Sequence, residues 1–253
     1  MPESPASSPV LRTDTIRIPG HLNGPPTSGH GGYTSAMVAA PLQGAVAVDL
    51  RRPVPLERPL ERRLLEGGRT DLRDGDTLIA EGKQISLELE IPPAPDWNET
   101  VQAAERYAGL RFHPFDTCFG CGPRRREGDG LRIFAGPRAS GSELAAPWIP
   151  HASLAAPGAP LPPEMVWSAL DCPAGWASDF TTRGKFPDGA QAVTAQLAVR
   201  IDAPVYTGRR YTILGWPVRT EGRKVSTGAA MYDEGGTAVA VATALMVILL
   251  PKT

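Results

Sequence analysis

The ten residues NGPPTSGHGG, numbered 23–32, are the most informative stretch of this chain, because they combine turn-forming residues with the start of a helix. They lead into Gly32–Ala40, a segment of small and apolar residues that we expect to be helical and that carries no acid. A second helical segment, Pro163–Ala177, begins with prolines and carries Asp171 at the equivalent depth. Nothing resembling His-Gly-Gly precedes it. Each half of the chain therefore holds a different part of one helix motif.

Two stretches in the first half recur in the same order in the second half. Residues 46–54, VAVDLRRPV, align with residues 197–205, LAVRIDAPV, and both are β-rich segments that end in Pro-Val, where proline is typical of a strand edge or bulge. Residues 74–80, DGDTLIA, align with residues 234–240, EGGTAVA, and each has a glycine-containing hairpin turn before a strand. Chance similarity between β segments is the alternative, but two ordered matches favour an internal repeat.

Each half is predicted to contain one helix followed by a run of long antiparallel strands, which is an α+β arrangement present twice. We expect a flexible tail over residues 1–12, a first half over 13–93, a linker with a short helix over 94–115 and a second half over 116–253. The linker helix spans Asp96–Ala108, and we expect its apolar residues Trp97, Val101, Ala104 and Tyr107 to be packed. The expected strands are Gly44–Arg52, Pro59–Glu66, Gly68–Arg73, Thr77–Glu90, Val193–Ala203, Arg209–Arg219, Lys224–Asp233 and Thr237–Leu250.

Composition excludes several classes of function. The chain has 253 residues and a net charge of −1, so bulk attraction to nucleic acid or to a membrane surface is not expected. Met1–Pro9 has no signal-peptide pattern, and the apolar run Thr237–Leu250 is too short to span a bilayer. Three cysteines do not form a secreted disulfide framework. We therefore expect a cytoplasmic protein.

The motifs resemble a known superfamily. An Asn-Gly-x-x-Thr segment followed by His-Gly-Gly at a helix start is similar to the phenylacetyl-CoA-type branch of hotdog acyl-CoA thioesterases, with one extra residue before His30. Residues 168–177, SALDCPAGWA, resemble the helix of that family that carries its acid, and residues 118–123, CFGCGP, followed by Gly130-Leu131, resemble a segment before its first strand. The resemblance covers most of residues 13–253 and implies a double hotdog fold.

The chain also departs from the family pattern in each half. Ala39 stands where the first helix would carry the acid, and Pro162-Pro163-Glu164 stands where the second would carry His-Gly-Gly. The resemblance implies that the glycine and the acid of one site come from opposing subunits. Transferred to a fused chain, it predicts one composite site in which Gly31 faces Asp171.

The expected roles follow from thioester chemistry. An unsatisfied N–H at a helix N-terminus can polarise a carbonyl, which makes Gly31 the expected oxyanion donor and Asn23 a second donor. Asp171 would act as general base or nucleophile, and Thr194 could position the water. The remaining expected substrate-binding residues are His30, Gly32, Trp167 and Trp176. His-Gly-Gly could instead be only a turn and helix start, and Asp171 only a structural acid.

Other residue clusters favour simpler interpretations. Cys118 and Cys121 form a single C-x-x-C, and a zinc site needs further ligands, for which His113, His151 and Cys172 are available without diagnostic spacing. We expect packed, reduced thiols and no metal. The run Arg124–Arg126 is expected to be a solvated loop, with contact to CoA phosphates as the alternative.

The sequence thus predicts an acyl-CoA thioesterase that needs no cofactor beyond the CoA of its substrate. A non-catalytic acyl-CoA-binding protein is the main alternative, because both halves have lost family residues. A hotdog hydratase is disfavoured, since neither helix has an Asp and a His five residues apart. Long edge strands make a homodimer of double-hotdog chains plausible.

Overall fold

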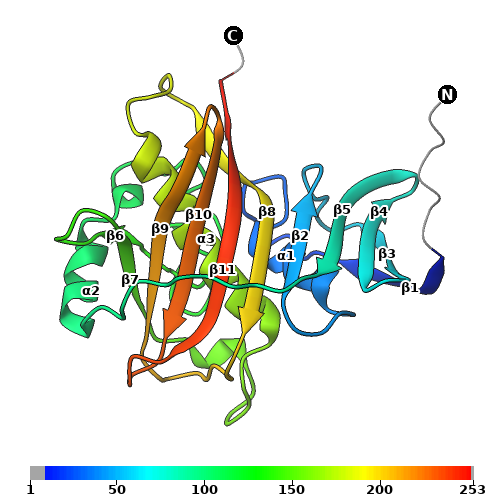
Figure 1. Ribbon diagram of the computed structural model, residues 1–253, viewed down its shortest axis with the longest axis horizontal. Helices are drawn as coiled ribbons and strands as arrows, with labels where there is room; N and C mark the ends of the chain where they lie inside the picture. Colours follow the sequence, from blue (N-terminus) through cyan, green and yellow to red (C-terminus); the bar gives the residue numbers. More distant parts are fainter. Residues whose placement is uncertain (1–8, 252–253) are drawn as a thin grey trace.

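A computed structural model describes residues 9–251, which form an eleven-stranded antiparallel sheet. Its strand order is β1-β3-β4-β5-β2-β8-β11-β10-β9-β7-β6 (Figure 1). The first half supplies β1 (Val10–Arg17), β2 (Val46–Leu50), β3 (Pro59–Leu65), β4 (Arg69–Asp74) and β5 (Thr77–Gln84). The second supplies β6 (Gly136–Pro137), β7 (Leu144–Trp148), β8 (Gln191–Ile201), β9 (Tyr211–Glu221), β10 (Lys224–Tyr232) and β11 (Ala238–Leu249).

One helix packs in each half, and together they confirm the predicted tandem arrangement. α1 (Gly31–Ala39) lies against β2, β4 and β5, whereas α3 (Pro163–Thr182) lies against β7 to β11. α2 (Trp97–Glu105) packs on β7 and β6, and the short 3-10 helices are η1 (Ala108–Leu110) and η2 (Ala152–Leu154). One continuous apolar core includes Val38 and Leu72 of the first half and Leu170 and Ile213 of the second.

The internal repeat is visible in the strand pairing. The four strands that follow the helix have the same order in both halves. From the outside of the sheet to its middle they are β3, β4, β5 and β2 in the first half, and β9, β10, β11 and β8 in the second. β2 and β8 pair antiparallel at that middle, and Ala47 lies opposite Ala198, its aligned counterpart in the repeat. A pseudo-two-fold axis therefore passes between these two residues, and it relates the start of α1 to the start of α3.

The strands that precede each helix were not predicted. β1 begins at Val10, inside the stretch 1–12 that was expected to be a tail, while residues 1–8 of that stretch lie outside the described residues. β7 holds the equivalent position before α3. Both strands are short or polar, and neither has the long apolar run that marks β8 to β11. The sheet edges are β1 and β6. Pairing of chains through them stays a prediction.

The strand predicted to reach Glu90 ends at Gln84 instead. The chain then leaves the sheet and crosses the strands of the second half, on the face opposite α3 (Figure 1). Leu87 is buried there against Trp216 and Val241, and Leu89 and Ile91 pack partly against the same cluster. The alternating apolar residues in this segment therefore cover a sheet instead of extending one.

The linker helix is shorter than predicted, and of the four residues expected to be packed Tyr107 is buried, Trp97 and Ala104 are half-buried and Val101 is exposed. α2 ends at Glu105, and its buried residues are Thr100 and Ala103, whereas Val101 is exposed. Asp96 caps the helix by accepting from the N–H groups of Asn98 and Glu99. Val101 was expected on the packed face, and that expectation is wrong, because the contact with β7 fixes a face one position away. Among residues 9–251, no helix is long and apolar enough to span a membrane.

Candidate active site

The N-terminus of α1 meets the middle of α3 across the pseudo-two-fold axis. A Cβ atom added to Gly32 would lie 2.5 Å from the carbonyl oxygen of Trp167 and 2.7 Å from the Cα of Ser168. No side chain fits in that space, so glycine is required for the two helices to approach. This contact brings the first half's His-Gly-Gly onto the second half's acid.

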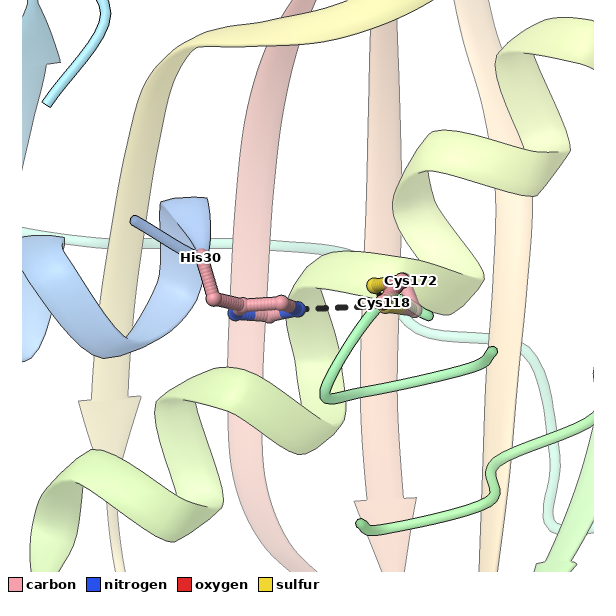
Figure 2. A group of neighbouring side chains, drawn as sticks. All are labelled: His30, Cys118 and Cys172. Carbon is pink, nitrogen blue, oxygen red and sulfur yellow. Dashed lines mark hydrogen bonds between the residues drawn. The ribbon is translucent and has the colours of Figure 1, made fainter. Parts of the chain in front are cut away.

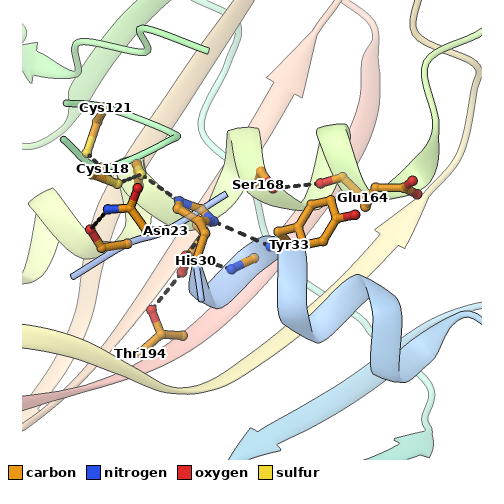
Figure 3. A network of polar contacts seen from close by, with 12 residues as sticks. Asn23, His30, Tyr33, Cys118, Cys121, Glu164, Ser168 and Thr194 are labelled. Atoms are coloured by element: carbon orange, nitrogen blue, oxygen red, sulfur yellow. Dashed lines mark hydrogen bonds and ion pairs between the residues drawn. The ribbon is translucent and has the colours of Figure 1, made fainter. Parts of the chain in front are cut away.

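The Asp171 carboxylate lies directly at the start of α1. Its Oδ2 accepts a hydrogen bond of 2.8 Å from the Gly32 N–H, and its Oδ1 accepts one of 2.7 Å from the Thr194 hydroxyl on β8. The side chain is buried within an otherwise apolar part of α3. A buried carboxylate needs such donors, and a helix N-terminus also favours its negative charge. Thr194 is labelled beside this network in Figure 3.

Gly31 lies next to the same carboxylate. A Cβ atom at this residue would be 2.8 Å from Asp171 Oδ2 and 3.0 Å from Thr194 Oγ1. Gly31 is the first residue of α1, so its N–H has no acceptor within the helix. No hydrogen bond from that N–H to any of residues 9–251 is present. The structure thus brings Gly31, Gly32, Asp171 and Thr194 together from both halves.

His30 supports this arrangement from inside the protein. Its Nδ1 accepts from the Tyr33 N–H and caps α1, while its Nε2 is 3.3 Å from the Cys172 sulfur (Figure 3). Only 1% of the residue is exposed, so its contacts are with protein atoms. Burial lowers the pKa of His30, but the nearby Cys118 sulfur and Asp171 carboxylate outweigh burial and raise the pKa overall.

A cavity of about 1270 Å³ opens beside these residues. Gly31, His30, Asp171, Thr194 and Trp176 all contribute to its wall. Its outer part is lined by five exposed or partly exposed arginines, namely Arg51, Arg52, Arg106, Arg111 and Arg183. The N-terminus of α1 and the acid therefore share one cleft, which is large enough for a long ligand.

Three of the predicted site residues are not on the cavity wall. Gly32 is buried between α1 and α3, where its N–H donates to Asp171. Trp167 is buried and contacts α1 through its carbonyl oxygen. Asn23 is also buried, and its amide donates to the carbonyl oxygens of Gly24 and Pro25. Its Oδ1 accepts a bond of 2.6 Å from Arg125. Asn23 therefore holds a loop together in this structure, and its amide hydrogens are already committed to backbone.

The arginine run also lies away from the cavity. Arg125 is buried and donates to the carbonyl oxygens of His21 and Thr117, so it is not part of a solvated loop as predicted. Arg124 is exposed and pairs with Asp116. None of residues 124–126 lines the cavity. Arg125 and Asn23 are 102 positions apart, so their contact could not be predicted from the sequence.

The pseudo-two-fold axis relates this site to a second position, where the start of α3 meets α1. That position lacks the groups found at the first. α3 begins at Pro163, after Pro162, and proline has no N–H to offer at a helix N-terminus. α1 carries no acid to face it. The position related to the first by the pseudo-two-fold axis therefore has neither the glycine N–H nor the carboxylate, which leaves one candidate composite site among residues 9–251.

A cluster of thiols lies behind His30. Cys118, Cys121 and Cys172 are all buried and free, and the Cys118 sulfur is 3.7 Å from that of Cys121 and 3.8 Å from that of Cys172. Hydrogen bonds from the other two thiols lower the pKa of Cys118 well below its usual value, against the opposing effect of burial. Of the other ligands that the sequence offered, His113 lies beside Cys121, whereas His151 bonds to Ser153 elsewhere.

Comparisons with solved structures agree on the fold. A TesB protein from Mycobacterium avium subsp. paratuberculosis is 14% identical, with a TM-score of 0.60, and the match covers 94% of this chain and 93% of that one. The acyl-CoA thioesterase II TesB2 from Mycobacterium marinum is 12% identical, with a TM-score of 0.58 and 97% of each chain covered.

A hotdog-fold protein of unknown function from Alicyclobacillus acidocaldarius is 11% identical, with a TM-score of 0.56 over 96% of this chain and 95% of that one. No family model and no curated protein sequence matches the chain. The matches span nearly the whole of both chains. This protein therefore has the double hotdog fold.

Proposed function

We propose that this protein hydrolyses an acyl-CoA thioester at one site between its two halves. The observation that carries the proposal is the position of the Asp171 carboxylate, which lies at the N-terminus of α1 and in the wall of the same cavity as Gly31. A carbonyl-polarising N–H and a carboxylate are the two groups that thioester hydrolysis requires.

In the proposed reaction, the thioester oxygen accepts a hydrogen bond from the Gly31 N–H. The partial positive charge at the helix N-terminus stabilises the oxyanion as it develops. Asp171 takes a proton from water, which attacks the carbonyl carbon, or the carboxylate attacks directly and the resulting anhydride is hydrolysed. The carbon–sulfur bond breaks, and the products are a carboxylic acid and the free thiol of CoA.

The residues that line the cavity support a CoA ester as substrate. Exposed arginines such as Arg52 and Arg111 line its outer part, and arginine suits the phosphates of CoA. Trp176 and Phe186 line the same cavity and offer apolar surface to an acyl group. Two proteins of the same fold are named for this kind of chemistry, as a TesB protein and as an acyl-CoA thioesterase II.

The direct test is hydrolysis of a panel of acyl-CoA esters by the purified chain. Straight-chain esters from short to long and an aryl ester would be offered at equal concentration, with release of the CoA thiol followed by a thiol reagent. We expect turnover that saturates with at least one ester. Rates equal to the no-enzyme background across the whole panel would rule the proposal out.

A second function, acyl-CoA binding without turnover, is favoured by one specific observation. Both oxygens of Asp171 already accept hydrogen bonds, and only 5% of the residue is exposed. Calorimetry on the same panel separates the two functions. Saturable binding of an ester that is never hydrolysed would identify a binding protein.

The Thr194 hydroxyl provides a milder test of the proposed site. Thr194→Val removes the 2.7 Å hydrogen bond to Asp171 Oδ1, so the carboxylate loses one of the two hydrogen bonds that fix its orientation. We expect kcat to fall by roughly 10- to 100-fold, since a hydrogen bond to a charged group is worth about 1.5–3 kcal/mol. Thr194→Ser keeps the hydroxyl and should stay within a few-fold of wild type. Equal kcat for the two variants would remove Thr194 from the site.

A further inference from the structure

Four potential metal ligands converge behind the candidate active site. Cys118 and Cys121 come from the loop after the linker, Cys172 comes from α3, and His30 precedes α1. Cys118, Cys172 and His30 offer ligand atoms that lie within 4.8 Å of one another, and all three residues are buried. Cys121 is not in that group, but its sulfur lies 3.7 Å from that of Cys118, at the edge of the cluster. Figure 2 shows the His30 ring pointing at the two sulfurs. Three segments far apart in the sequence thus supply one compact donor set.

Three of the six separations between the four ligand atoms match a tetrahedral thiolate site. Zinc–sulfur bonds of about 2.3 Å in a tetrahedron place the sulfurs about 3.8 Å apart. The Cys118 sulfur is 3.7 Å from Cys121 and 3.8 Å from Cys172, and His30 Nε2 is 3.3 Å from the Cys172 sulfur. A disulfide would need a sulfur separation of about 2.05 Å. These spacings therefore suit a shared ion better than a bond between the thiols.

We propose that Cys118, Cys121, Cys172 and His30 bind one Zn²⁺ ion. Three thiolates and one imidazole are a common ligand set for structural zinc, and four protein ligands leave no open position for a substrate. The ion would join the 118–121 loop and α3 to the residue that caps α1. It therefore has a structural role, distinct from the proposed chemistry at Asp171, and it would hold His30 and Gly31 in place.

The surroundings of the cluster have the features of an outer ligand shell. Trp176 Nε1 donates to the Cys121 sulfur at 3.4 Å, and His113 Nε2 lies 3.3 Å from the same sulfur. Binding through Nε2 would place the ring hydrogen of His30 on Nδ1, which could then no longer accept from the Tyr33 N–H. Nδ1 is 3.7 Å from Asp171 Oδ2, and metal-bound histidines commonly donate their second ring N–H to a carboxylate.

A glycine lets the cysteine loop reach its partners. A Cβ atom on Gly120 would lie 2.4 Å from the Cys172 sulfur and 2.7 Å from His30 Nε2. Any larger residue at this point would push the loop away from α3. The C-x-x-C segment is therefore shaped to bring its two sulfurs to the third cysteine and the histidine.

The first experiment measures metal in the intact chain. The protein is purified under reducing conditions without a metal-affinity step, and its zinc content is determined by mass spectrometry. We expect about one zinc per chain. In parallel, Co²⁺ is added to reduced, metal-stripped protein, and the visible bands of tetrahedral cobalt with a thiolate charge-transfer band are expected. Negligible zinc together with no such cobalt spectrum would overturn the proposal.

Variants then assign the ligands. Cys121→Ser and Cys172→Ser should each weaken Co²⁺ binding at least roughly 10-fold and lower the charge-transfer intensity, because each removes one thiolate. His30→Asn removes the imidazole but keeps a side chain that can cap α1, so it should change the cobalt bands without unfolding the chain. His113→Ala and His151→Ala serve as controls and should retain one equivalent.

Two results would contradict the ligand assignment. Loss of metal in His113→Ala but not in His30→Asn would remove His30 from the set. Mass spectrometry showing a disulfide between any two of the three cysteines in freshly purified protein, with no bound metal, would replace the ion by a covalent link. Neither readout uses acyl-CoA hydrolysis, so this proposal and the proposed enzymatic function can fail independently.

Discussion

Asp171→Asn is expected to lower kcat for acyl-CoA hydrolysis by roughly 100- to 10,000-fold, the usual contribution of a positioned acid or base. The amide cannot take a proton from water or attack a carbonyl. It can, however, keep both local contacts: its oxygen can accept from the Gly32 N–H, and its NH₂ can donate to Thr194 Oγ1. The fold should therefore survive, and thiol-release kinetics on the best ester of the panel would measure the effect.

Asp179→Asn is the matched control. Asp179 is an acid on the same helix that also lines the cavity, but it pairs with Arg183 on the surface. Its replacement should leave kcat within a few-fold of wild type. An Asp171→Asn protein with wild-type turnover would show that this carboxylate has only a structural role, as a partner for the start of α1.

Gly32→Ala is expected to destabilise the protein by forcing α1 and α3 apart. The new Cβ would lie 2.5 Å from the Trp167 carbonyl oxygen and 2.9 Å from Asp171 Cβ, neither of which can move without shifting α3. Overpacking of this kind costs about 1–3 kcal/mol or more. Since 1 kcal/mol corresponds to roughly 2–4 °C for a chain of this size, thermal unfolding should show a Tm lower by several degrees.

Gly175→Ala provides the comparison for Gly32→Ala. Gly175 also lies within a helix, but an added Cβ would meet only the end of the Met246 side chain, at 3.4 Å. Alanine is favoured over glycine inside a helix by about 0.5–1 kcal/mol, so stability should be unchanged or slightly higher. A Gly32→Ala protein that unfolds at the same temperature as Gly175→Ala would refute the close helix approach.

Most of the fold was predictable from residue patterns. The long apolar strands β8 to β11 and the hairpin turns at residues 74–77 and 233–237 give strong local signals, and both halves repeat them. The strands β1 and β7 were missed, because they are defined by their neighbours in the sheet and not by their own composition. The segment after Gln84 alternates like a strand but packs across the sheet, a choice that the alternation alone cannot reveal.

The candidate site was predictable only in part. Gly31 and Asp171 could be paired because the resemblance to hotdog thioesterases implies that the glycine and the acid of one site come from opposite copies of the repeat. The hydrogen bond from Gly32 to Asp171 and the loop held by Asn23 and Arg125 depend on atoms brought together from residues more than 100 positions apart. Sequence spacing carries no information on such contacts. The contacts of Cys172 and His30 with Cys118 could likewise not be predicted from sequence spacing.

The sequence by itself determined that this chain is a repeat, that each copy is one helix with a long sheet, and that the motif is divided between the copies. The repeat and its elements follow from periodicity and turn chemistry, which act over a few residues, whereas the division of the motif follows from the resemblance to hotdog thioesterases. Only the tertiary structure decided that the two parts of the divided motif lie together. Gly31, at the start of α1, and Asp171 of α3 can share one cavity only if the two helices approach each other closely. That distance is set by the packing of Gly32 against Trp167 and Ser168.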